Sequence, residues 1–226
     1  MPKLIVALDI DKLQDAKRLV ETLRPAVELF KIGSQLFTAY GPEALRMVEE
    51  SGGQVFLDLK FHDIPNTVAS AVRSATALKV FMMTLHTIGG EEMMRSAADA
   101  AKKHAAELKI ERAKIVGVTV LTSDAAIGDT QKIVVDRALS AQRSGLDGVV
   151  CSVQEAAAVR QACRKDFVIV TPGVRLPEGD RGDQKRVASP ADAAAAGSDF
   201  LVVGRPVVAA TDPLRAAQEI LRGLAA

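Results

Sequence analysis

Eight short apolar runs alternate with segments of helical period along the chain, and this alternation limits the possible folds more than any other feature. Each run is rich in Val, Ile, Leu or Phe, whereas the intervening segments carry apolar residues three and four positions apart. The pattern predicts strands at Leu4–Leu8, Val27–Ile32, Gln54–Lys60, Val80–Leu85, Lys114–Leu121, Gly148–Cys151, Phe167–Thr171 and Phe200–Val203.

Continuous apolar runs are typical of parallel strands that are covered on both faces. Eight strand–helix units in 226 residues average roughly 28 residues each, close to the minimum for a right-handed crossover unit. We therefore predict an α/β protein with one domain, a (β/α)8 TIM barrel over residues 1–226. A doubly wound open sheet is the alternative, but Asp9-Ile10-Asp11 stands where that fold carries a glycine-rich dinucleotide turn.

Helix starts are marked at three places. Asp11 is expected to cap the first helix by accepting backbone hydrogen bonds, and Gly41-Pro42 and Asp212-Pro213 place proline where a missing N–H has no cost.

Composition excludes several classes of function. The formal net charge is +1, without the excess of Lys and Arg that binding to nucleic acid normally requires. No apolar run approaches the roughly 18 residues that cross a bilayer, and the start MPKLIVALDI does not resemble a signal peptide. Two cysteines, Cys151 and Cys163, suit a reducing compartment. We expect a cytoplasmic protein with no nucleic-acid or membrane partner.

Charged residues gather where strands are expected to end, which is where barrels carry their reacting groups. Strand side chains alternate between faces, so Asp58 and Lys60 are expected to project together into the barrel mouth. Lys31 from the neighbouring strand and Asp63 from the following turn would complete an array of two cations and two anions. Such an array can be a structural ion-pair network, but two enclosed lysines favour a role in stabilising and protonating a carbanion or oxyanion.

Glycine and arginine follow the seventh and eighth predicted strands. The segments Thr171–Arg175 and Val203–Arg205 occupy the loops that bind phosphate in many barrels, through backbone N–H groups and a cation. Either glycine alone could serve only a turn, whereas glycines on adjacent loops favour phosphate binding, with Arg205 as a bidentate donor.

The segment Asp58–Thr67, DLKFHDIPNT, closely resembles the signature of the orotidine 5′-monophosphate decarboxylase family. The resemblance spans essentially the whole chain, with one departure at Thr87-Ile88, where smaller residues are expected. Further matching blocks keep their order: Ala7–Asp9, Phe30–Gly33, His86–Gly90, Val118–Ser123, Gly145–Ser152, Thr171–Arg175, Gly182–Gln184 and Val203–Arg205.

The resemblance implies conversion of orotidine 5′-monophosphate (OMP) to UMP and CO2 in de novo pyrimidine synthesis, without metal or organic cofactor. It implies that Lys60 protonates C6 of the pyrimidine and that Asp58 lies against the substrate carboxylate, with Lys31 and Asp63 completing the array. It also implies a homodimer in which Asp63 and Thr67 reach the partner's site. The remaining implied substrate-binding residues are Asp9 and Lys31 for the ribose, Thr122 for the pyrimidine, Arg175, Gln184, Gly204 and Arg205 for the phosphate, and Ile64, Pro65 and Asn66 within the signature.

Two alternatives remain at this stage. A metal-dependent decarboxylase or epimerase of sugar phosphates shares the Asp-x-Lys-x-x-Asp core, but Lys31 stands where such enzymes usually need an acidic ligand. The three histidines, His62, His86 and His104, are too scattered to predict a metal site. A noncatalytic nucleotide-binding barrel is the other alternative, and it would be favoured if either lysine of the array were missing.

Overall fold

The computed structural model describes residues 1–121, 129–174 and 188–225. Its eight parallel strands pair in chain order and close where β1 pairs with β8, so the predicted barrel is confirmed and the open sheet is excluded. The strands are β1 Lys3–Ala7, β2 Leu29–Gly33, β3 Gln54–Phe61, β4 Met82–His86, β5 Lys114–Val118, β6 Gly148–Val150, β7 Val168–Pro172 and β8 Phe200–Val203.

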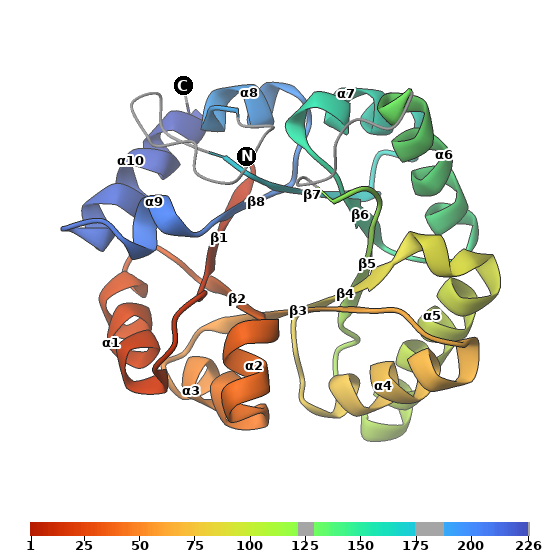
Figure 1. The fold of residues 1–226 in the computed structure, drawn as a ribbon, viewed down its shortest axis with the longest axis horizontal. Helices are drawn as coiled ribbons and strands as arrows, with labels where there is room; N and C mark the ends of the chain where they lie inside the picture. The colour runs from red at the N-terminus through yellow and green to blue at the C-terminus, as the bar shows by residue number, and fades with distance from the viewer. Residues whose placement is uncertain (122–128, 175–187, 226) are drawn as a thin grey trace.

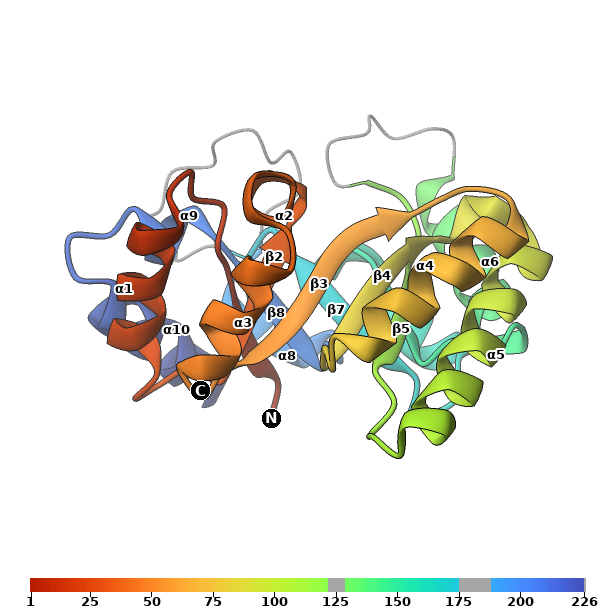
Figure 2. The ribbon, with the colours of Figure 1, turned by 90° about the horizontal axis from the view of Figure 1, so that it is seen from below.

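Helices surround the barrel in Figure 1, which looks down its axis. The strands point toward one end, and the N-terminus lies at the other (Figure 2). The helices are α1 Leu13–Leu23, α2 Ser34–Tyr40, α3 Pro42–Glu50, α4 Pro65–Ala77, α5 Gly90–Leu108, α6 Thr130–Arg143, α7 Val153–Ala162, α8 Pro190–Ala195, α9 Arg205–Val208 and α10 Pro213–Ala225, with a 3-10 turn, η1, at Thr87–Gly89.

Two of the three expected helix starts are confirmed. Pro42 and Pro213 open α3 and α10. The expectation that Asp11 caps the first helix is wrong. The N-cap of α1 is Lys12, so the helix begins one residue later than a cap at Asp11 would give. The Asp11 carboxylate instead accepts a hydrogen bond from Gln35 in α2 at 2.6 Å. The Asp11 carboxylate thus binds a side chain of α2 and not the backbone N–H groups at the start of α1.

The apolar side chains form two layers. One fills the space between strands and helices, and the other fills the barrel interior with Ile5, Ala7, Leu29, Phe56, Met82, Val116, Val170, Phe200 and Val202. Because successive strand residues face opposite sides, the same strands supply both layers. Among the described residues, no helix is both long and apolar enough to span a membrane.

Candidate active site at the carboxyl end of the barrel

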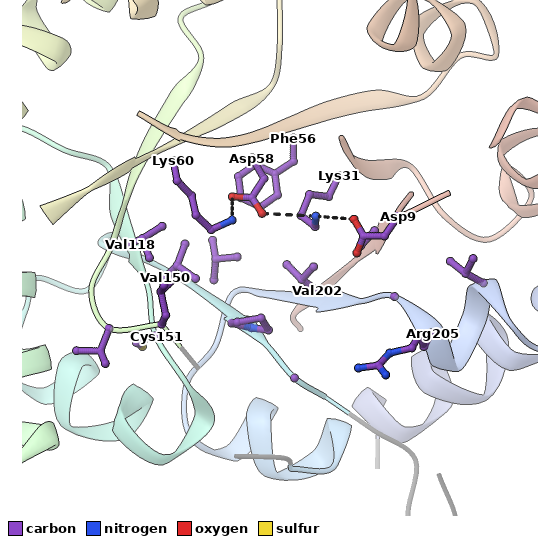
Figure 3. Close-up of a pocket in the computed structure, with 18 residues that line it drawn as sticks. Asp9, Lys31, Phe56, Asp58, Lys60, Val118, Val150, Cys151, Val202 and Arg205 are labelled. Atoms are coloured by element: carbon purple, nitrogen blue, oxygen red, sulfur yellow. Dashed lines mark hydrogen bonds and ion pairs between the residues drawn. The ribbon is translucent and has the colours of Figure 1, made fainter. Parts of the chain in front are cut away.

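A cavity of about 710 Å³ opens at the carboxyl ends of the strands (Figure 3). Its floor is the apolar barrel interior, and its rim is polar. The described residues that line it are Ala7, Asp9, Lys31, Phe56, Asp58, Lys60, Val118, Val120, Leu121, Val150, Cys151, Val170, Pro172, Gly173, Val202, Gly204, Arg205 and Val208.

The change from apolar floor to charged rim follows from strand periodicity. Leu29 faces the barrel interior, and Lys31, two residues later in β2, faces the cavity. Phe56 and Asp58 repeat this arrangement in β3, where Lys31 pairs with Phe56 in the sheet register. Inward positions near the strand ends therefore place charged groups on a packed apolar base.

Four side chains form a continuous line of alternating charge (Figure 3). The Lys60 ammonium lies 2.8 Å from Asp58 Oδ1, and the Lys31 ammonium lies 3.5 Å from Asp58 Oδ2. Lys31 also lies 3.2 Å from Asp9 Oδ1. Within one chain the line therefore runs Lys60, Asp58, Lys31 and Asp9, and Asp63 is not part of it.

Asp58 is 9% exposed, and it is the central anion of this line. Burial by itself raises the pKa of its carboxyl, because the charged form loses its hydration. The charges of Lys31 and Lys60, with hydrogen bonds from Lys60 and Thr84, outweigh burial and hold the pKa of Asp58 below its ordinary value. The carboxylate is thus ionised at neutral pH.

Lys60 reaches the cavity through an irregularity in β3 that simple alternation does not predict. Its φ is 53°, in the left-handed region, and the register between β3 and β4 shifts between Leu57 and Phe61. The expected proximity of Asp58 and Lys60 is confirmed, but a bulge produces it. The Lys60 backbone N–H donates to Thr84 Oγ1 at 2.8 Å.

Gly33 gives the Lys31 ammonium its space. A Cβ at this position would lie 3.0 Å from Lys31 Nζ and 3.5 Å from Asp9 Oδ1. Any side chain there would crowd the ion pair between Lys31 and Asp9.

The residues expected to bind phosphate are partly described. Gly173, with φ 81°, and Gly204 line the cavity, and Arg205 at the start of α9 lies across it from Lys60 (Figure 3). Gly173, which follows β7, and Gly204, which follows β8, thus line the same cavity. Thr122, Arg175 and Gln184 lie outside the described residues.

The segment from Asp63 to Thr67 does not join the cavity wall formed by the described residues of this chain. The Asp63 carboxylate is exposed and accepts a hydrogen bond from the Ile64 N–H at 2.6 Å. Ile64 is 66% exposed, Asn66 and Thr67 are exposed, and Pro65 opens α4. The signature therefore divides between a part that lines this cavity and a part at the molecular surface.

The histidines lie apart from the line of charges. The rings of His62 and His86 are 5.6 Å apart, and His104 pairs with Glu107 on α5. Burial lowers the pKa of His86, and the nearby His62 and Lys60 lower it further, so His86 is neutral at pH 7. Within the described ranges, no group of three or more His, Cys, Asp and Glu side chains could hold a metal ion.

Thr84 and the apolar cavity wall were not predicted from the sequence, and Gly33 was noted only as the end of the matching block Phe30–Gly33. Thr84 is the polar residue in the otherwise apolar Met82–Leu85, and this was the available signal. Val118 and Val150 stand in matching blocks, but no site role was expected for them or for Val202, because core and cavity valines look alike in a sequence.

Comparisons with known proteins show the family of this chain. A family model described as orotidine 5′-phosphate decarboxylase / HUMPS family matches residues 2–220. The orotidine 5′-phosphate decarboxylase of Moorella thermoacetica is 49% identical over 227 residues, covering 96% of this chain and 90% of the relative. That of Syntrophotalea carbinolica is 47% identical over 99% of this chain and 95% of its own.

A solved structure also shows similarity to an orotidine 5′-phosphate decarboxylase. The crystal structure of orotidine 5′-phosphate decarboxylase from Lactobacillus acidophilus matches with a TM-score of 0.87 and 32% identity, covering 100% of both chains. Fold, site and these likenesses together define an enzyme of the carboxy-lyase class on a (β/α)8 barrel. The chain belongs to the orotidine 5′-phosphate decarboxylase / HUMPS family.

The lowered pKa of Asp58 predicts how its contribution to stability depends on pH. The folded pKa lies below the unfolded value of about 3.9, so the stabilisation is fully present above that value and is lost as pH falls through the folded pKa. The free energy of unfolding, measured in urea from pH 7 to pH 2, should therefore differ between wild type and Asp58→Asn by a constant amount above about pH 5 and by a shrinking amount below about pH 4. A difference that stays constant down to pH 2 would contradict this.

Asp166→Asn is the matched control. Its carboxylate pairs with Arg164 at 2.9 Å, but its side chain is 78% exposed. Exposed pairs contribute about 0–1 kcal/mol, so this variant should change the free energy of unfolding little at any pH.

Proposed function

We propose that the enzyme converts OMP to UMP and CO2 without a cofactor, in de novo pyrimidine synthesis, and that Lys60 protonates C6 of the pyrimidine. The observation that carries the proposal is the Lys60 ammonium, 2.8 Å from the buried Asp58 carboxylate in the cavity at the barrel mouth. Family membership and the identity to OMP decarboxylases of other organisms support the substrate.

The chemistry needs a cation fixed in advance. When the bond between C6 and the carboxylate breaks, CO2 leaves and the electron pair remains on C6. Without an electron sink, the forming carbanion must be stabilised by groups that are already in place. The Lys60 ammonium supplies both the positive charge and the proton that C6 receives.

Asp58 acts on the carboxylate that leaves. Two like charges about 4 Å apart, at an effective dielectric constant of about 20, repel by about 4 kcal/mol. This corresponds to roughly a thousandfold in rate, which is only part of what decarboxylation requires. The rest comes from stabilisation of the carbanion and from binding energy at remote parts of the substrate.

The other end of the line holds the ribose. Lys31, 9% exposed and paired with both Asp58 and Asp9, provides ammonium donors, and the Asp9 carboxylate provides acceptors for the ribose hydroxyls. Lys31 also has an electrostatic effect: two ammonium groups in one cavity disfavour a divalent cation, which supports a metal-independent reaction over the metal-dependent alternative.

The phosphate binds on the opposite side, at Gly204 and Arg205, with Arg175 and Gln184 as further partners and Thr122 at the pyrimidine. Arg205 lies across the cavity from Lys60. A planar guanidinium can bind phosphoryl oxygens with two hydrogen bonds. The phosphate is remote from the reacting carbon. Binding energy from its contacts can therefore hold the pyrimidine against Asp58.

A homodimer explains the surface part of the signature. Asp63, Ile64, Asn66 and Thr67 are exposed, and Pro65, which opens α4, is partly exposed. We place this segment against the partner subunit, where Asp63 and Thr67 complete the partner's site. We also place the enzyme in the cytoplasm, where its two buried cysteine thiols would remain reduced.

The first prediction tests substrate, reaction and metal independence together. In buffer with a chelator, the absorbance of added OMP should decrease as UMP forms. Lys60→Ala should lower turnover by more than roughly a thousandfold, because both the proton and its charge are lost. Its circular dichroism and thermal unfolding should match those of wild type. Near-normal turnover by this variant would remove Lys60 from the role of proton donor.

The second prediction concerns phosphate recognition. Arg205→Ala should lower kcat/KM for OMP by roughly 10- to 100-fold, because a charge-assisted contact is lost, and should change kcat/KM for orotidine much less. Arg215→Ala removes a similar side chain from the outside of α10, where it pairs with Glu219, and serves as the control. Equal losses on OMP and orotidine would refute the phosphate role.

The third prediction concerns the shared site. Lys60→Ala and Asp63→Ala dimers should each be nearly inactive, but a hybrid dimer contains one site with both native residues. Mixed and re-equilibrated subunits should therefore recover about a quarter of wild-type activity, since half of the dimers are hybrids with one intact site of two. Hybrids that form, as detected by mass spectrometry of differently tagged subunits, but remain inactive would exclude the shared site.

A further inference from the structure

The bulge in β3 leaves one residue of β4 opposite three residues of β3, two of which, Asp58 and Lys60, carry the reacting groups. Leu57 pairs with Met83, and Phe61 pairs with Leu85, so residues 58–60 of β3 face only Thr84. At this point the regular pairing of the two strands is interrupted, and the backbone of Lys60 takes φ 53°, which is unfavourable for a residue with a side chain.

Thr84 occupies this gap with its hydroxyl group. Its side chain is buried, with the residue 1% exposed. The hydroxyl accepts the Lys60 backbone N–H at 2.8 Å and donates its own proton to Asp58 Oδ1 at 3.0 Å. Because Lys60 Nζ donates to the same Asp58 oxygen at 2.8 Å, backbone, hydroxyl, carboxylate and ammonium form a closed ring of hydrogen bonds.

We propose that Thr84 is a positioning residue of the decarboxylation, whose hydroxyl fixes the Lys60 backbone in its left-handed conformation and orients the Asp58 carboxylate. This inference rests on the proposed roles of Lys60 and Asp58. Thr84 does not belong to the described cavity wall, so it acts on the substrate only through these two residues.

The two hydrogen bonds of the hydroxyl explain why a threonine can occupy the buried position 84. A hydroxyl has one donor and two acceptor sites, so it can satisfy an N–H and a carboxylate at the same time. A valine of the same shape would leave the Lys60 N–H and one hydrogen-bonding site of Asp58 without this partner. The free backbone and carboxylate could then adopt other orientations, and a misplaced proton donor lowers the rate with little effect on binding.

The same hydroxyl also stabilises the ionised form of Asp58. A hydrogen bond to a carboxylate lowers its pKa, and the bond from Thr84 is one of the interactions that hold the pKa of Asp58 low. Burial and the charges of Lys31 and Lys60 are larger influences. His86 is the only titratable residue of β4, and its own pKa is affected by burial, by His62, by Lys60 and Asp58 of this cluster, and by Arg137 of α6.

The experiment compares three residues at position 84 with wild type. Thr84→Val should lower kcat for OMP by roughly 10- to 100-fold, the range for loss of a hydrogen bond to a charged group, and change KM by less than about threefold. The acid limb of its pH–kcat profile should move to higher pH, because the Asp58 carboxylate loses a hydrogen bond. Thr84→Ser, which keeps the hydroxyl, should restore kcat to within about threefold of wild type, and Thr84→Ala should behave like Thr84→Val.

Thr76→Val is the matched control. Thr76 is a buried threonine of α4 whose hydroxyl donates to the Val72 carbonyl at 2.8 Å, away from the cavity. Its valine variant should keep the wild-type kcat and pH profile. A loss of activity by Thr76→Val equal to that of Thr84→Val would overturn the proposal, because it would trace both losses to general destabilisation.

Two further outcomes are distinguishable. If wild type decarboxylates OMP and folded Thr84→Val keeps the wild-type kcat and pH profile, the positioning role is refuted. If wild type itself does not decarboxylate OMP, the proposed function fails first. If Thr84→Val does not fold, the ratio of kcat between Thr84→Ser and Thr84→Ala measures the contribution of the hydroxyl to kcat. Equal kcat values for these two variants would refute the role of the hydroxyl.

Discussion

The ion pairs around Asp58 are the interaction on which the site depends. A carboxylate that is 9% exposed would be strongly destabilised by the loss of its hydration if it stood alone. Ammonium groups on both sides and the hydroxyl of Thr84 offset this cost and keep the group ionised. The site can therefore present a fixed negative charge to a substrate carboxylate and, 2.8 Å away, a cation to the electron pair that remains after CO2 leaves.

The barrel makes this arrangement possible because one part of a strand packs in the apolar interior and its carboxyl end carries the charged groups. Leu29 and Phe56 pack in the barrel interior, and Lys31 and Asp58, two residues later on the same strands, face the cavity. The apolar layer limits hydration beneath the charges, and the closed sheet fixes the spacing between β2 and β3. The charged groups are thus held in place before a substrate arrives, as electrostatic stabilisation requires.

Three of the four residues expected in the array meet within one chain, and the fourth, Asp63, lies in the exposed segment that we propose faces the partner subunit. Strand alternation and strand order predicted that Asp58, Lys60 and Lys31 would meet, and they do. The contact between Asp9 and Lys31 joins the ends of β1 and β2. A local pattern cannot show this contact, because it depends on the register between the two strands.

Side-chain periodicity is a local property of the backbone, so it was enough to predict the eightfold alternation, hence the barrel, and the positions of charged residues at strand ends. The long signature also identified the family. Three features became visible only in the folded chain: Lys60 reaches Asp58 from a left-handed backbone, Thr84 bridges the two, and Gly33 leaves room for the Lys31 ammonium. These features depend on distances between atoms of different strands, which closure of the barrel fixes and local periodicity does not.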